Sequence, residues 1–253
     1  MKKVNNDLVL VSKKFVAEEL QKKFGDIWNE ICVFVYGSVS YGLADNFSNI
    51  NLEVILPDNK FSKINSIITK KDGKEIKIDF SRWSKYEEYF PTFPKNCEFS
   101  FWIIEKAIVL HDPSGRFQNI KEKVNKYFPE DIWKDKIFEK WFQVSFNGIK
   151  KALERNEIIT AQINKGKMIQ AVMELVFLLN RQYLPPIKWL HRLFLNLPHL
   201  SKEIEPHLNI ILEIQDPDEF EKENRLVNEI IGRYLKSNNL LSNEKIEKPW
   251  MFV

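Results

Sequence analysis

A glycine and a serine directly follow a short apolar run near the N-terminus, a combination of residue types that could bind an anion. Residues 33–36 are β-branched or aromatic, and the run stops abruptly at Gly37-Ser38. A buried strand that feeds a tight turn is expected to have this pattern. Gly37 lets the backbone approach a ligand closely, and Ser38 offers a backbone N–H and a hydroxyl. We therefore predict that Gly37 and Ser38 contact phosphate groups.

A second apolar run follows after a loop over residues 41–48, and it alternates with polar residues. In an extended strand, residues 49, 51 and 53 lie on one face and residues 50, 52 and 54 on the other. The first face reads Asn49, Asn51 and Glu53, and the second is aliphatic. One face is therefore predicted to be polar and the other to be part of the core.

Together these stretches resemble the nucleotidyltransferase (polymerase β-like) superfamily, whose motif is an apolar strand, Gly-Ser, a loop, and Asp-x-Asp on the next strand. Gly37-Ser38 matches that motif. Residues 41–48 also resemble the Gly-x-x-Asp-x-x-Ser loop of the branch that contains the DUF4037 proteins. Where the superfamily has Asp-x-Asp, however, this chain has Asn49-Ile50-Asn51.

A second resemblance lies in residues 178–190, which are similar to the Asn-Arg-x-Tyr-x-Pro-x-x-Lys-Trp-Leu segment in the C-terminal helical domain of DUF4037 proteins. Arg181 and Lys188 flank a proline turn, where their cations could face a triphosphate or an anionic acceptor. An equally weighted alternative is that Asn180 and Arg181 cap a helix C-terminus while Lys188 is solvated. The two resemblances cover most of residues 30–200.

The resemblance implies an α/β (α+β) fold, with a nucleotidyltransferase-type mixed sheet and flanking helices followed by an all-helical C-terminal domain. It implies transfer of a nucleoside monophosphate from an NTP, with ATP expected, to a hydroxyl of a small molecule or macromolecule. Asn49 and Asn51 would stand at the Mg²⁺-ligand positions. Asp79 would be the third carboxylate, or the base that orients the acceptor hydroxyl. Without the resemblance, Asp79 would be interpreted as a solvent-facing acid on an amphipathic strand.

The two asparagines change the expected chemistry of this motif. Mg²⁺ prefers carboxylate and phosphate oxygens, and an amide keeps one neutral oxygen but loses the charge. At an effective dielectric of about 20, each charge lost at roughly 4 Å removes up to about 4 kcal/mol of attraction for a monovalent partner. The sequence as written is therefore expected to be inactive or strongly impaired. The alternative is a non-catalytic nucleotide-binding or regulatory module.

Three explanations of the asparagines stay open at this point. The chain could be a pseudoenzyme that has kept its nucleotide pocket, or Asn49 and Asn51 could be deliberate replacements of aspartate. An unusual metal arrangement that uses Asp45, Glu53 and Asp79 is the third, and charge disfavours it. Nucleic-acid binding has little support because no single element combines a basic run with interleaved aromatic residues.

The periodicity of apolar residues changes from about 2 to about 3.6 after Pro129, which predicts two domains, residues 1–128 and 129–253. The N-terminal part is expected to contain a helix over residues 8–24 and strands over 31–36, 50–56, 64–69 and 75–80. A hairpin turn is expected at Asp72-Gly73, and a helix leading into a short strand over 99–109. Helices are expected over residues 130–155, 157–182, 187–196, 201–213 and 217–236.

Composition excludes several classes of protein. The chain has 253 residues, of which 44% are hydrophobic, and a net charge of +3. This charge is too close to balance to indicate nucleic-acid binding.

Cys32 and Cys97 are expected to be reduced thiols, and the four histidines are expected to be structural rather than zinc ligands. No membrane span is expected, and a cytoplasmic location follows. The apolar tail, residues 248–253, could dock on the body or on a second subunit, so a homodimer is possible.

Overall fold

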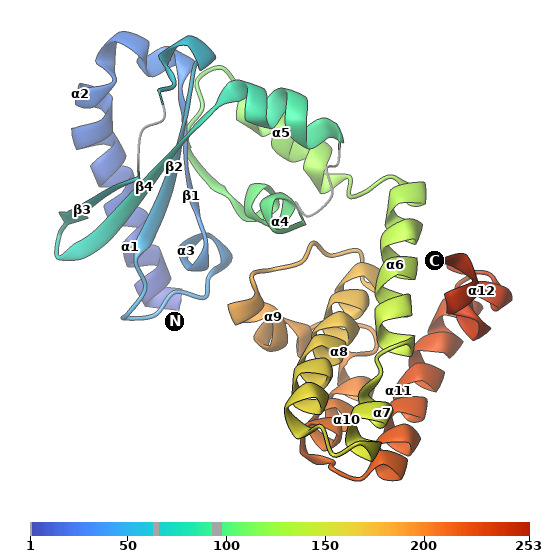
Figure 1. Cartoon of the computed structure of the whole chain (residues 1–253). Helices are drawn as coiled ribbons and strands as arrows, with labels where there is room; N and C mark the ends of the chain where they lie inside the picture. The colour runs from blue at the N-terminus through green and yellow to red at the C-terminus, as the bar shows by residue number, and fades with distance from the viewer. Residues whose placement is uncertain (1, 63–65, 93–97) are drawn as a thin grey trace. The chain divides into compact units, whose positions relative to one another are not determined.

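The computed structural model describes residues 2–62, 66–92 and 98–253. The chain forms two compact units, Met1–Lys126 and Tyr127–Val253 (Figure 1). The sequence places the boundary nearby, between residues 128 and 129. Cys97 lies outside the described residues, as does the start of the strand expected over residues 64–69.

The first unit is built on a five-stranded sheet with the strand order β3-β4-β2-β1-β5. β2 pairs in parallel with β4, while β1–β2, β1–β5 and β3–β4 are antiparallel, so the sheet is mixed. The strands are β1 Cys32–Tyr36, β2 Ile50–Leu56, β3 Ile67–Lys71, β4 Lys74–Arg82 and β5 Ile108–His111. Every strand predicted from apolar alternation is present, and the β3–β4 hairpin turns at Asp72-Gly73, where both residues have positive φ.

The register of the three central strands decides which side chains meet. Tyr36 of β1 is paired with Asn51 of β2, and Asn51 is paired with Lys77 of β4. Two residues further along β2, Glu53 is paired with Phe34 of β1 on one side and with Asp79 of β4 on the other. Paired residues point to the same face of a sheet, so polar groups from three strands gather on one side.

The opposite face of the sheet forms the core, as the alternation in β2 predicts. Ile50, Leu52 and Val54 are fully buried there. They belong to the same hydrophobic cluster as residues of α1 Lys2–Phe15 and η1 Val16–Leu20, which run into α2 Gln21–Lys23. The helix predicted over residues 8–24 begins earlier in the structure, at Lys2.

Aromatic residues fix the helices that cover the polar face of the sheet. Phe34 is fully buried, and its ring stacks on that of Phe117 in α5 Arg116–Asn125, with 4.4 Å between centroids. The Tyr86 ring of η4 Lys85–Tyr89 packs edge-on against Phe34. Figure 1 shows α5 and α4 Glu98–Lys106 on the opposite side of the sheet from α1 and α2. The short elements η2 Gly25–Glu30, α3 Ser38–Tyr41, η3 Asp58–Lys60 and η5 Phe90–Thr92 complete the unit.

The second unit is helical throughout. Its helices are α6 Glu130–Ser145, α7 Ile149–Glu154, α8 Ile158–Leu179, α9 Ile187–Phe194, α10 Ser201–Glu213, α11 Pro217–Ser237, α12 Asn243–Glu247 and η6 Pro249–Phe252. The apolar stripe of α8, from Met168 to Leu179, is buried, as its spacing predicts. The predicted fold class, a mixed sheet with flanking helices followed by an all-helical part, is confirmed.

One predicted helix is in fact two helices. The helix expected over residues 130–155 is interrupted between α6 and α7. Gly148 adopts a left-handed conformation with φ 67°, and the side-chain oxygen of Asn147 accepts a hydrogen bond from Ile149 N at 3.1 Å. This asparagine–glycine pair ends one helix and starts the next, a local effect that hydrophobic periodicity does not reveal.

His111 and Cys32 have structural environments. His111 stacks on Trp28 with 3.8 Å between ring centroids, and its Nε2 lies 2.8 Å from Trp28 O. Cys32 is a buried free thiol, and burial raises its pKa. Within the described ranges, no helix combines the length and apolarity needed to cross a membrane.

Replacing Phe34 with alanine is expected to destabilise the first unit by about 3–5 kcal/mol, because it removes the ring on which Phe117 and Tyr86 pack. Phe47→Ala is the matched control: that ring is 94% exposed, so the change should stay within about 0.5 kcal/mol. The measurement is urea unfolding followed by near-UV circular dichroism. Equal effects of the two substitutions would contradict this account of the core.

Candidate functional site

The Gly37-Ser38 turn leaves β1 with a backbone that only glycine adopts without strain. Gly37 has φ 80° and ψ −147°, and Ser38 begins α3. Leu43 N donates to Ser38 O at 2.9 Å, and Ser40 Oγ donates to Gly37 O at 3.0 Å, which holds the turn closed. Across the described ranges, the Ser38 hydroxyl itself makes no hydrogen bond to protein. Hydrogen bonds within the turn therefore hold its shape, and the Ser38 hydroxyl is left as an unused donor.

Asn51 lies directly against this turn. A Cβ atom placed on Gly37 would come within 3.1 Å of Asn51 Nδ2. The structure therefore brings together the Gly-Ser turn and the second asparagine of the motif. A side chain at position 37 would displace this amide.

Asn49 is exposed at the start of β2, and its Nδ2 donates to Glu75 Oε1 at 2.5 Å. An amide suits this position because it can donate to the carboxylate. An aspartate at position 49 would instead face Glu75 with a like charge unless a cation lay between them.

Asp79 is held by hydrogen bonds on both of its oxygens. Ser66 Oγ donates to Oδ1, and Tyr36 Oη donates to Oδ2. Lys77 Nζ lies 3.0 Å from the same Oδ2, and the Asp79 side chain is only 22% exposed. Burial by itself raises the pKa of Asp79, but the hydrogen bonds from Ser66, Tyr36 and Lys77 outweigh burial and lower it below 3.8. Asp79 is therefore an ionised carboxylate, and both of its oxygens already accept hydrogen bonds from the protein.

Glu53 is the neighbour of Asp79 in the sheet, and it is only 8% exposed. Tyr86 Oη donates to its Oε1 at 2.7 Å, and Lys85 Nζ lies 3.5 Å from the same atom. Burial, and after it the charge of Glu53, raises the pKa of Tyr86, which keeps that phenol protonated as a donor. The side-chain partners of Glu53 thus lie in η4 and not in the Gly-Ser turn.

The residues at the expected metal positions do not fit Mg²⁺. Two of the three positions are amides, and the third, Asp79, already pairs with an ammonium group. Asp45 is used inside its own loop, where Oδ1 accepts from Phe47 N at 3.0 Å and from Ser48 Oγ at 2.9 Å. Over the described parts of the chain, no three His, Cys, Asp or Glu side chains form a group that could hold a metal ion. The arrangement with Asp45, Glu53 and Asp79 therefore has no support in the geometry.

Arg181 and Lys188 belong to the second unit, and their role at a ligand stays a prediction. The Arg181 guanidinium lies over the Trp133 ring, 3.6 Å from the centroid, and its Nη2 donates to Glu130 Oε2 at 2.7 Å. Asn180 Nδ2 donates to Val176 O at 2.7 Å at the end of α8. Asn180 therefore caps the C-terminal end of α8, whereas the Arg181 side chain pairs with α6 and does not cap the helix. Lys188 is exposed beside Trp189.

Four residues of this site were not singled out from the sequence: Tyr36, Ser66, Glu75 and Lys77. The alternation of β4 does place Lys77 on the same face as Asp79, so its position could have been inferred. The contributions of Tyr36 and Ser66 depend on the pairing of strands and on a loop, which a single sequence does not specify.

The pKa of Asp79 is expected to lie below 3.8 and to rise toward that value in Tyr36→Phe, which removes one donor. A lowered pKa in the folded state means that the carboxylate stabilises the fold above the unfolded pKa, and that this contribution is lost as pH falls through the folded pKa. The measurement is a ¹³C NMR titration of the carboxyl group. Tyr41→Phe is the control and should leave the titration unchanged. A wild-type pKa at or above 3.8 would contradict the contacts described.

Comparison with known proteins gives matches of two kinds. The model of the family described as "Domain of unknown function (DUF4037)" matches residues 98–190. Eleven chains of solved structure match, among them the crystal structure at 1.90 Å of a nucleotidyltransferase-like protein from Exiguobacterium sibiricum 255-15. That protein is 12% identical with a TM-score of 0.49, and the match covers 92% of this chain and 79% of that chain. At this TM-score the similarity carries no argument about the present chain.

No curated protein matches the sequence significantly. The family match runs from α4 to α9, so it includes the segment with Arg181 and Lys188 but not the Gly37-Ser38 turn. It confirms, for residues 98–190, the resemblance to DUF4037 proteins that the segment 178–190 indicates.

Proposed function

We propose that the first unit is a non-catalytic nucleotide-binding module that holds a nucleoside triphosphate, ATP in the first instance, without Mg²⁺. The Gly37-Ser38 turn contacts the terminal phosphates. The observation that carries this proposal is the position of Lys77. Its Nζ lies 3.0 Å from Asp79 Oδ2, and Lys77 is paired with Asn51 in the sheet. A fixed cation of the protein thus lies on the face where the parent family uses a metal ion.

The balance of charge on this face supports binding of an anion without metal. Asn49 and Asn51 are neutral, Lys77 offsets Asp79, and Lys85 lies near Glu53. Glu75, which accepts from Asn49, has Lys70 as its cross-strand neighbour. Three carboxylates in these motif positions would repel a triphosphate unless Mg²⁺ neutralised them. At an effective dielectric of about 20, each removed charge lowers that repulsion by up to about 4 kcal/mol at roughly 4 Å. Amides therefore make a metal ion less necessary for binding and at the same time disfavour metal-assisted transfer.

The state of Asp79 argues against its acting as a general base. An efficient base has a pKa near the working pH, whereas the pKa of Asp79 is lowered. Its two oxygens accept hydrogen bonds from three side chains, so an acceptor hydroxyl would have to replace one of them. Asp79 in this proposal orients Tyr36 and Lys77. The parent reaction, transfer of a nucleoside monophosphate to a hydroxyl of a small molecule or macromolecule, is then absent or strongly impaired.

The catalytic part of the proposal predicts that the chain binds ATP but releases no pyrophosphate. The experiment measures pyrophosphate release and label transfer from α-labelled NTPs with Mg²⁺ or Mn²⁺, with cell extract as the source of acceptor. The variant Asn49→Asp/Asn51→Asp is assayed beside the unmodified chain. Activity confined to the aspartate form indicates a transferase scaffold disabled at its metal positions. Transfer by the unmodified chain would overturn the proposal.

The binding part predicts that Lys77→Met weakens ATP binding by about tenfold or more, because it removes the cation on the binding face. Lys22→Met is the matched control, since Lys22 is an exposed lysine of α2, which covers the opposite face of the sheet. Affinity is measured by titration calorimetry in EDTA, and circular dichroism verifies the fold of each variant. If the two lysine variants bind equally well, Lys77 does not contact the nucleotide.

A further inference from the structure

A cavity of about 420 Å³ opens in the first unit between η4, η5, α4 and α5. Its size lies within the usual range for small-molecule sites. Three aromatic residues line its wall, Tyr86, Phe90 and Phe101, and each is largely buried. The Tyr86 and Phe90 rings are 5.3 Å apart, and the Phe90 and Phe101 rings 5.8 Å. The three rings therefore pack on one another and give the cavity an apolar wall.

Polar groups of α5 stand on one side of this cavity. Arg116, Asn119 and Lys123 line it together with the aliphatic residues Ile120 and Val124. Among the described residues, Lys123 is exposed and makes no ion pair, and the Asn119 side chain makes no hydrogen bond. The side chains of Asn119 and Lys123 therefore provide hydrogen-bond donors beside the apolar wall of the cavity.

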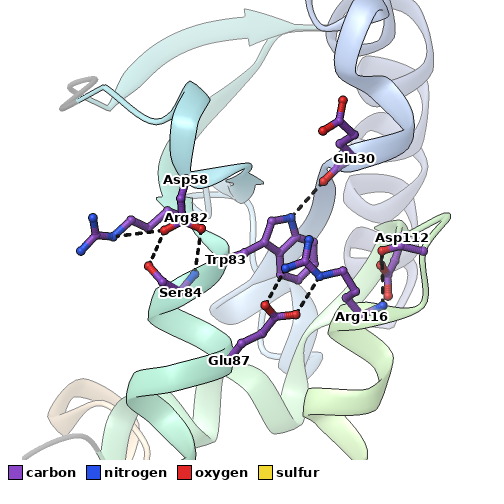
Figure 2. Close-up of polar contacts among 9 residues, drawn as sticks. Glu30, Asp58, Arg82, Trp83, Ser84, Glu87, Asp112 and Arg116 are labelled. Atoms are coloured by element: carbon purple, nitrogen blue, oxygen red, sulfur yellow. Dashed lines mark hydrogen bonds and ion pairs between the residues drawn. The ribbon is translucent and has the colours of Figure 1, made fainter.

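Arg116 is held in place before any ligand arrives. Figure 2 shows its guanidinium over the Trp83 ring and paired with Glu87. The guanidinium carbon lies 4.1 Å from the ring centroid, and the two hydrogen bonds to Glu87 measure 2.7 and 2.5 Å. Trp83 is itself fixed by donation from its Nε1 to Glu30 O at 2.9 Å. This bidentate pair neutralises Glu87, the only acidic residue of the lining, and leaves further N–H donors on Arg116.

The cavity therefore carries a net positive charge from Lys123 beside an aromatic wall. We propose that it binds a small planar aromatic acid, with the ring against Tyr86, Phe90 and Phe101 and the carboxylate toward Lys123 and Asn119. This site is separate from the Gly37-Ser38 turn and does not depend on the proposed nucleotide binding. It is nevertheless connected to the sheet, because Tyr86 forms its wall and also donates to Glu53.

The test compares an anionic and a neutral probe of the same ring system, 2-naphthoate and 2-naphthalenemethanol, by titration calorimetry on the full chain. The unmodified protein is expected to bind the acid, and Lys123→Met to bind it about tenfold more weakly, with no change for the alcohol. Lys126→Met is the matched control: it removes an exposed lysine next to the C-terminal end of the same helix, outside the cavity, and should have no effect.

A second variant tests the location of the ring. Ile120→Trp fills the cavity and should abolish binding of both probes, with circular dichroism verifying the fold. If Ile120→Trp does not fold, the comparison of Lys123→Met with Lys126→Met still decides the proposal. Absence of binding to the unmodified chain, equal affinity for acid and alcohol, or equal affinity in the two lysine variants would each overturn it.

Discussion

The register of β2 between β1 and β4 is the constraint on which the candidate site depends. The parallel pairing with β4 sets Lys77 beside Asn51 and Asp79 beside Glu53. The antiparallel pairing with β1 sets Tyr36 beside Asn51. A shift of one residue would turn these side chains into the core and expose Ile50, Leu52 and Val54. Burial of the aliphatic face thus stabilises the register, and the register assembles the polar face.

The polar face differs from a metal site in how its charges are balanced. Asp79 is paired with Lys77, Asn49 donates to Glu75, and Glu53 is buried next to Tyr86. Each carboxylate therefore has a partner within the protein and has little need of a divalent cation. The same pairing places Lys77 in register with Asn51, whose amide lies against the Gly37-Ser38 turn.

Much of this could be predicted from the sequence, and the exceptions have physical causes. Strands β2 and β4 follow from strict alternation, and the helices α8, α10 and α11 from their apolar stripes and end signals. The break at Gly148 was missed because one left-handed residue outweighs the periodicity around it. At the site, the turn at Gly37-Ser38 and the polar face of β2 were predicted, but the hydrogen bonds of Tyr36 and Ser66 to Asp79 were not. Those contacts join residues far apart in the chain, so no local pattern encodes them.

The dependence of ATP affinity on Mg²⁺ tests the central claim most directly. The measurement is the dissociation constant of the unmodified chain for ATP, determined once with Mg²⁺ in excess and once with EDTA. Because protein cations and amides replace the metal in this account, the two values are predicted to agree within about threefold, a difference of less than about 1 kcal/mol. Binding that requires Mg²⁺, with a loss of more than about tenfold in EDTA, would contradict the account.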